Sequence, residues 1–298
     1  MRILFSVVLI SLLFSGCIKN NQDPSWIEIS EWTLQENPNS LNQTGVLTSN
    51  LTNAWVYMDG DIIGVFELPV KLPILKDGTH NFKIYPAILN NGISATKKIY
   101  PFLESYDITL DLVKNETASI SPTTRYYSNV KFWIEDFEDA SPNLVDGNST
   151  LAHIEKVDVN DNDPVFNSSI NEGAFGRVRV DETNNIWIGS TTANNGSLNM
   201  NLPRGQEVYL EIDYHNTNSL TTGVLAIDGN GVAKDNVNIK LNPQDPSSVK
   251  WKKIYIDLRE IVSSSTNASY FEFSFKSILD SGDSDGEVNI DNIKAVYF

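Results

Sequence analysis

The sequence has few of the side chains on which most enzyme active sites depend. It contains a single cysteine, Cys17, and three histidines, His80, His153 and His215. No pair of histidines has a metal-ligand spacing such as HxxxH, and no GxSxG nucleophile motif is present. Carboxylate pairs are expected by chance among 38 acidic residues, so they do not by themselves indicate a glycosidase. We therefore predict a protein without catalytic activity.

Basic residues are scarce as well. The chain has 22 Lys and Arg residues against 38 Asp and Glu residues, which gives a formal net charge of -16. Proteins that bind nucleic acid neutralise its phosphates with Lys and Arg. The charge therefore argues against a nucleic-acid partner, and it fits a solvated surface that could attract divalent cations.

The N-terminal apolar run is too short to cross a membrane. The chain opens MRILFSVVLISLLFSGC, in which Arg2 precedes an apolar run over residues 3–14. About twelve apolar residues cannot span the ~30 Å hydrocarbon layer of a bilayer, but they match the core of a signal peptide. We therefore expect residues 1–16 to be a signal peptide.

The end of this run resembles a bacterial lipoprotein signal, because two small residues precede Cys17. Phe14 stands where that family usually has Leu. The resemblance implies that Cys17 becomes a lipidated N-terminus and that residues 17–25 tether a folded body to a membrane, since two or more acyl chains anchor stably. The residue after the cysteine is Ile18 and not Asp. By the same resemblance this implies that the protein is sorted to the outer membrane, on either face of it. An ordinary secretory signal with an incidental cysteine is the alternative.

Helical periodicity is also missing, and the pattern that replaces it is typical of β structure. Short β-rich runs are separated by Asn, Gly, Asp and Pro, as in all-β sandwiches. The runs form two groups, at residues 26–121 and 130–298, with a short linker at 122–129. We therefore predict an all-β protein with two domains.

The first group contains two Asp-Gly pairs between apolar runs, Asp59-Gly60 and Asp77-Gly78, and Asp-Gly is a strong hairpin signal. The order of strand, DG, G, P, DG and strand resembles PEGA-like modules of bacterial envelopes. The blocks WVYMDG, GVFELP and NGISATKKIYPF are also similar to the N-terminal half of a group of Bacteroidetes lipoproteins. The resemblance implies a small β-sandwich-like spacer domain and brings no known activity.

The second group begins with VKFWIEDFED and ends with EVNIDNIKAVYF. These two ends, with the strand-like runs between them, resemble jelly-roll, galactose-binding-like modules of carbohydrate-binding proteins. The resemblance implies a jelly-roll β-sandwich whose first and last strands pair. It also implies a polysaccharide or other glycan as partner.

Period-2 alternation separates core positions from candidate ligand positions in this second group. In EVYLEIDYH, Val208, Leu210 and Ile212 share one face, and in VKWKKIYIDL, Ile254 and Ile256 do the same. The opposite faces carry aromatic rings beside polar groups, a combination that suits sugar recognition. With Trp187, which lies off the aliphatic face of its run, the candidate ligand-binding residues are Trp187, Tyr209, Glu211, Asp213, His215, Trp251 and Tyr255. The alternative is that these faces pack against a loop, a domain or a partner.

A structural calcium ion is a third expectation. The jelly-roll resemblance implies a calcium site beside the paired first and last strands, with one acid from each end of the domain. The matching positions are Glu138 and Asp291, and calcium takes six to eight oxygen ligands. Alternatively, Asp291 pairs with a lysine or caps a turn.

The run VDVNDNDPVF at residues 157–166 resembles the calcium-binding linker of cadherins, but its context does not match. Lys156 stands where that motif has an apolar residue. An EF-hand loop is excluded because Asp163 occupies the glycine position and Ser169 the position of the bidentate Glu. We therefore predict an Asx-rich turn before a strand at Val165, with a calcium-ordered loop as the alternative.

Two functions are compatible with these patterns. One is a membrane-anchored, carbohydrate-binding lipoprotein of the cell envelope, and the other is an envelope scaffold that binds a protein. The first predicts that the four aromatics of the candidate set line one open surface. These are Trp187, Tyr209, Trp251 and Tyr255.

Overall fold

A computed structural model describes residues 23–159, 162–192 and 200–298. The predicted signal peptide, Cys17 and most of the predicted tether lie outside this part of the chain, as do two residues of the VDVNDNDPVF run. The described residues are almost entirely strands and loops, with one short helix, α2 (Arg259–Ser264), so the predicted all-β class is confirmed. No described helix is long and apolar enough to span a membrane.

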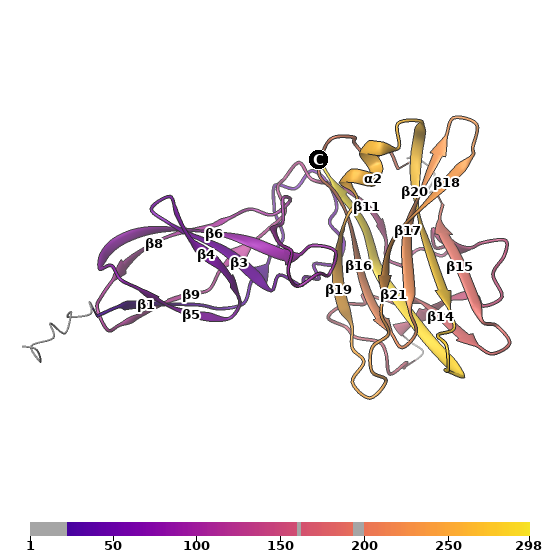
Figure 1. Ribbon diagram of the computed structural model, residues 1–298, viewed down its shortest axis with the longest axis horizontal. Helices are drawn as coiled ribbons and strands as arrows, with labels where there is room; N and C mark the ends of the chain where they lie inside the picture. Colours follow the sequence, from indigo (N-terminus) through magenta and orange to yellow (C-terminus); the bar gives the residue numbers. More distant parts are fainter. Residues whose placement is uncertain (1–22, 160–161, 193–199) are drawn as a thin grey trace, which may run out of the picture.

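The N-terminal domain is a sandwich of two sheets (Figure 1). One sheet has the strand order β5-β1-β9, with bounds Val70–Ile74, Ser25–Ile29 and Thr117–Ile120. The other contains β3 (Asn53–Met58), β4 (Asp61–Glu67), β6 (Gly78–Leu89), β7 (Lys97–Ile99) and β8 (Tyr106–Leu112). Fully buried apolar side chains such as Ile27, Val56 and Ile84 fill the space between the two sheets.

Only one of the two Asp-Gly pairs forms a hairpin. Asp59 and Gly60 have φ values of 53° and 91°, and they join β3 directly to its antiparallel neighbour β4. Asp77 and Gly78 instead lead from β5 into β6, which belong to different sheets. The two strands of a hairpin must pair with each other, and β5 and β6 do not. The Asp77-Gly78 turn therefore carries the chain from one sheet to the other.

The segment expected to be a linker is packed into the structure. Within residues 122–129, strand β10 (Thr123–Thr124) pairs with β2 (Thr33–Leu34). Tyr126, two residues later, is buried. The two domains are therefore not joined by a free tether.

The C-terminal domain is a second sandwich, of a six-stranded and a five-stranded sheet (Figure 1). The first contains β11 (Lys131–Glu135), β13 (Ile154–Asp158), β14 (Ala174–Asp181), β16 (Val208–Asn216), β19 (Lys252–Asp257) and β21 (Asp285–Tyr297). The second contains β12 (Leu144–Asp146), β15 (Ile186–Thr191), β17 (Leu220–Asp228), β18 (Ala233–Leu241) and β20 (Ala268–Ile278). The opening strand β11 pairs with the closing strand β21, as expected.

Alternation identifies the core of this sandwich correctly in β16 but not in β15. Val208, Leu210 and Ile212 have no exposed surface, as predicted. Trp187, which alternation assigns to the face opposite the aliphatic residues, is also fully buried. Its ring stacks on that of Phe275, with centroids 6.4 Å apart. Ile188 is the half-exposed neighbour. The large ring buries more apolar surface than an isoleucine, so the core takes the tryptophan.

The two sandwiches share a continuous apolar contact. Tyr209, Tyr255 and Val296 of the six-stranded sheet belong to the same buried cluster as the N-terminal core. The C-terminus lies at the same junction (Figure 1). There the ring centroid of Phe298 is 5.0 Å from that of Phe102. The outer face of the six-stranded sheet is therefore partly covered by the other domain.

Candidate functional site

Four predicted ligand-binding residues lie inside the contact between the domains. Tyr209 and Glu211 are 0% exposed, Asp213 is 1% exposed and Tyr255 is 3% exposed. An open sugar-binding face at these positions is therefore absent, and the alternative of packing against a neighbouring domain is what the structure shows. Alternation separated the two faces of the strands correctly, but it could not reveal what covers the polar one.

Glu211 is the centre of this contact. Its Oε1 accepts hydrogen bonds from the hydroxyls of Tyr100 at 2.5 Å and Tyr126 at 2.9 Å. Its Oε2 lies 2.9 Å from the ammonium of Lys253, which is also buried. Burial raises the pKa of Glu211, but Lys253 and Lys294 outweigh this and hold the pKa below its ordinary value. The Glu211 carboxylate is therefore charged, and its hydrogen-bonding and ion-pair partners all come from the protein itself.

The other three buried candidates are also engaged. The hydroxyl of Tyr209 donates to Asn90 Oδ1 at 2.8 Å, and the hydroxyl of Tyr255 accepts from the backbone N–H of Asn50 at 3.0 Å. Asp213 accepts from the hydroxyl of a threonine, Thr48, at 2.5 Å. Each of these partners belongs to the N-terminal domain, so these polar groups join the domains and are not available to a ligand.

The remaining two candidates, His215 of β16 and Trp251 just before β19, are half-buried and contact each other. Trp251 donates its Nε1–H to the carbonyl of Val165 at 2.7 Å, and its ring centroid is 5.9 Å from that of His215. Burial lowers the pKa of His215 below its ordinary value. The predicted residues are thus divided between a domain contact, a loop contact and the core.

The VDVNDNDPVF run contributes the anchor of the loop that contains Val165. Asp163 accepts hydrogen bonds from both terminal nitrogens of Arg177, at 2.5 and 2.7 Å, and Arg177 is 3% exposed on its side chain. The guanidinium lowers the pKa of Asp163 to about 2. The described part of the run contains the predicted turn, held by an ion pair between Asp163 and Arg177 of β14. The strand predicted at Val165 is wrong, because Val165 lies in a turn and the next strand, β14, begins at Ala174.

The carboxylates of Glu138 and Asp291, the two residues predicted to bind calcium, accept hydrogen bonds from neighbouring groups. Glu138 Oε1 accepts two backbone N–H groups, from Gly173 at 2.7 Å and Ala174 at 2.8 Å. Asp291 accepts from the Asn171 amide on one oxygen and from a backbone N–H on the other, and burial raises its pKa well above the ordinary value. Within the described residues, no group of three or more His, Cys, Asp and Glu side chains could hold a metal. Calcium binding stays a prediction that these donors do not favour.

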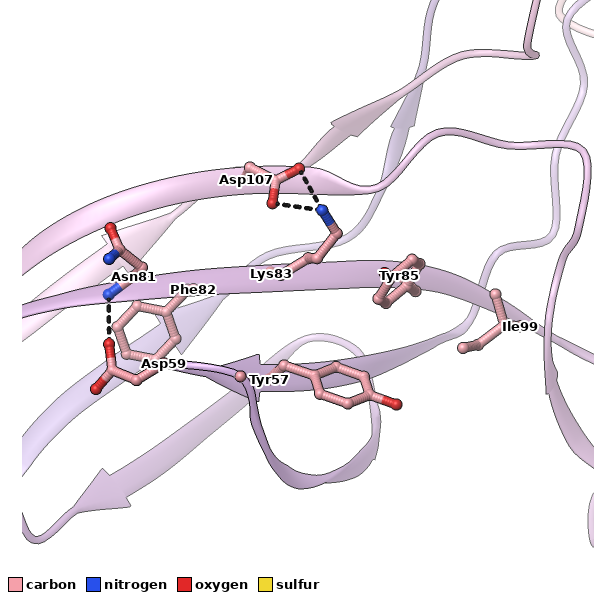
Figure 2. Close-up of a pocket in the computed structure, with 9 residues that line it drawn as sticks. Tyr57, Asp59, Asn81, Phe82, Lys83, Tyr85, Ile99 and Asp107 are labelled. Carbon is pink, nitrogen blue, oxygen red and sulfur yellow. Dashed lines mark hydrogen bonds and ion pairs between the residues drawn. The ribbon is translucent and has the colours of Figure 1, made fainter.

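A groove with half-exposed aromatic rings lies instead on the N-terminal domain, in the sheet that contains β3 and β6. Figure 2 shows the side chains that line it. Val56 and Ile84 point into the core, so their strand neighbours point outward. The groove has a volume of about 790 Å³. Its lining includes Tyr57, Tyr85 and Ile99, and the two tyrosine rings meet edge to face with centroids 5.7 Å apart.

Polar groups border these rings (Figure 2). Lys83 pairs with Asp107 at 3.0 Å, and its ammonium lies 5.8 Å from the centroid of the Tyr85 ring. Near the hairpin turn, Asp59 accepts from the backbone N–H of Asn81 at 3.0 Å, a bond that lowers the pKa of this aspartate. The groove therefore presents aromatic surface, an amide, a carboxylate and an ammonium together.

Alternation in the sequence contains a signal for this groove. In NAWVYM and HNFKIYP, alternation places Tyr57, Lys83 and Tyr85 opposite the buried aliphatic residues. Their proximity depends on the pairing of β3 with β6, strands that are separated by a crossing through the other sheet.

No family model matches the sequence, and no curated protein matches it either. Among solved structures, a xylan-binding domain of carbohydrate-binding module family 22 is similar, with 12% identity, a TM-score of 0.36, and 55% of this chain and 93% of that chain covered. A C-terminal family 22 module from Clostridium thermocellum has 14% identity, a TM-score of 0.35, and coverages of 55% and 92%. A family 11 module of a cellulosomal cellulase from Clostridium thermocellum has 16% identity, a TM-score of 0.34, and coverages of 57% and 97%. What these neighbours bind is a property of those proteins. The assignment of this chain to the all-β class is based on the strands of its own structure.

Proposed function

We propose that this protein is a non-catalytic, lipid-anchored protein of the cell envelope that binds a carbohydrate in the groove between Tyr57 and Tyr85. The observation that carries the proposal is the half-exposed pair of aromatic rings with hydrogen-bonding side chains beside it (Figure 2). Aromatic rings cover the C–H faces of a sugar, while amide and carboxylate groups bind its hydroxyls.

The charges around the groove favour a neutral saccharide. Lys83 is compensated by Asp107, and Asp59 lies 2.6 Å from the ring nitrogen of His80. A charged ligand would have to compete with these pairs, whereas sugar hydroxyls can donate to the carboxylates without displacing their partners. Within the described residues, the hydroxyls of Tyr57 and Tyr85 have no hydrogen-bond partner, so both can serve a ligand.

The lipid anchor in this proposal rests on the N-terminal signal and Cys17. The first strand of the folded body, β1, begins at Ser25, eight positions after this cysteine. A short tether of this kind holds the N-terminal domain close to the membrane. The groove would then bind glycan near the membrane, with the C-terminal sandwich attached through the buried contact around Glu211.

A glycan array with the purified protein tests the groove. We expect binding to at least one neutral polysaccharide. In calorimetry with an oligosaccharide of that polymer, Tyr57→Ala and Tyr85→Ala should each weaken binding at least tenfold. The matched control is Tyr270→Ala, because Tyr270 is a half-exposed tyrosine on β20 of the other domain.

Two results would overturn the proposal. One is the absence of neutral polysaccharide binding on the array, and the other is unchanged affinity in both groove variants. Recovery of an envelope protein that is lost with the same two substitutions would assign the face to the alternative function, a protein scaffold.

A further inference from the structure

A second, separate pocket lies where the two domains meet. Its volume is about 380 Å³, and no residue of the Tyr57–Tyr85 groove lines it. Three segments distant in the sequence form its walls. They are residues 47–50 of the N-terminal domain, residues 169–170 of the loop anchored by Asp163, and residues 250–253 at the start of β19.

Positive charge gathers at this pocket in a chain whose formal net charge is -16. Lys250 and Lys252 line it and are exposed, and neither ammonium has an ion-pair partner among the residues that the structure describes. Lys253 is buried and pairs with Glu211. The two exposed lysines are therefore free to bind an anion.

The single acid in the pocket lining does not cancel this charge. Asp213 accepts the hydroxyl proton of Thr48 and lies 3.9 Å from the ammonium of Lys253. It is 1% exposed, so it lies at the base of the pocket and not at the mouth. The buried lysines Lys253 and Lys294 face the two buried acids, Glu211 and Asp213. Lys250 and Lys252 are therefore left without an acidic partner among the described residues.

The rest of the lining suits a sugar ring. Trp251 is half-buried and held in place by its hydrogen bond to Val165 and by edge-to-face contact with Phe175, whose centroid is 5.6 Å away. An aromatic ring fixed before binding loses little conformational entropy when a ligand packs on it. Ser49 and Ser169 add hydroxyl groups from two different walls.

We infer that this pocket binds an acidic saccharide, a glycan with a carboxylate on its sugar ring such as a uronic acid. The carboxylate pairs with Lys250 and Lys252, and the sugar ring contacts Trp251. Because the walls come from both domains, the bound saccharide also bridges them. The pocket and the neutral-sugar groove are independent sites, so either can fail without the other.

Calorimetry of the purified protein with trigalacturonate tests this inference, and its methyl ester is the matched probe because it has the same ring without the charge. We expect the ester to bind at least tenfold more weakly. We expect the Lys250→Gln, Lys252→Gln double variant to lose at least tenfold in affinity, and raised salt to weaken binding of the wild type. Lys276→Gln, an exposed lysine on β20, should bind normally.

Inorganic phosphate separates a sugar-acid site from a general anion site. Binding of phosphate as tight as that of trigalacturonate would overturn the saccharide assignment. Equal binding of the acid and its ester, unchanged affinity of the double lysine variant, or no binding of trigalacturonate would overturn the inference altogether. A parallel titration of Tyr57→Ala should give wild-type affinity for trigalacturonate, because that residue lies in the other site.

Discussion

The hydroxyl of Tyr100 in the N-terminal domain donates to the carboxylate of Glu211 in the C-terminal domain at 2.5 Å, with both side chains fully buried. A charged carboxylate in an apolar interior is stable only when its partners replace water. Here those partners are Tyr100, Tyr126 and Lys253. This one acid therefore depends on both domains for its solvation, which makes the contact between them specific.

Removal of the Glu211 carboxylate should strongly destabilise the protein. Glu211→Ala leaves Lys253 as a buried charge without its closest partner, and we expect a loss of about 3–5 kcal/mol in the free energy of unfolding. Urea denaturation measures this. Glu207→Ala is the control, because Glu207 immediately precedes β16, is partly exposed and pairs with Lys98 at 3.0 Å. The loss of this ion pair should cost under about 1 kcal/mol. Equal losses would contradict the buried role of Glu211.

Replacement of Trp187 should destabilise the protein more than replacement of Ile188. Alternation alone predicts the reverse order, because it assigns Ile188 to the core face. Trp187→Ala removes a fully buried ring, and we expect a loss of about 3–5 kcal/mol in stability. Ile188→Ala removes a half-exposed side chain and should cost about 1 kcal/mol. Thermal and urea unfolding of the two variants measure the difference. A larger loss for Ile188→Ala would show that the strand faces are reversed.

The ion pair between Asp163 and Arg177 should make stability depend on pH in the acid range. The pKa of Asp163 falls from 3.8 to about 2 on folding, so its contribution is fully present above about pH 4 and is lost as the pH falls toward 2. This shift corresponds to about 2 kcal/mol at neutral pH.

Asp163→Asn tests this dependence. We expect the variant to be less stable than wild type at pH 6 and the difference to shrink at pH 2.5, as measured by urea denaturation at both values. Asp139→Asn, which alters an exposed carboxylate in another loop, should follow the wild type at both. A difference between Asp163→Asn and wild type that does not change with pH would contradict the ion pair as its source.

Calcium should leave the melting temperature unchanged, because N–H donors already occupy oxygens of Glu138 and both oxygens of Asp291. A ligand that binds the native state raises the melting temperature. The measurement is a pair of melting curves, in calcium and in chelator. A higher melting temperature in calcium that Asp291→Ala abolishes would establish the site implied by the jelly-roll resemblance.

Replacement of Cys17 should release the protein from membranes. The sequence has no other cysteine, so Cys17→Ser removes the only thiol that a lipid could modify. We expect the wild type to partition into the detergent phase after Triton X-114 separation and the variant to stay in the aqueous phase. Detergent-phase partitioning of Cys17→Ser would contradict a lipid anchor at this position.

Local patterns determined much of the fold. Asp59-Gly60 supplies two residues with positive φ, so the hairpin between β3 and β4 follows from two adjacent letters. Alternation likewise predicted that Val208 and Leu210 are buried, because a strand presents successive side chains to opposite faces. The all-β class and the pairing of the first and last strands of the second domain followed from patterns of this kind and from resemblance.

The function of each polar face was decided only by the tertiary structure. Alternation shows that Asp213 points away from the core of its own sandwich, but its partner Thr48 lies 165 positions earlier. Likewise, Tyr57 and Tyr85 form a groove only because β6 returns to pair with β3 after the chain has crossed through another sheet. A strand pattern specifies two faces, whereas exposure depends on which distant segments fold against them, and that information is held in contacts between domains and not in any single run of residues.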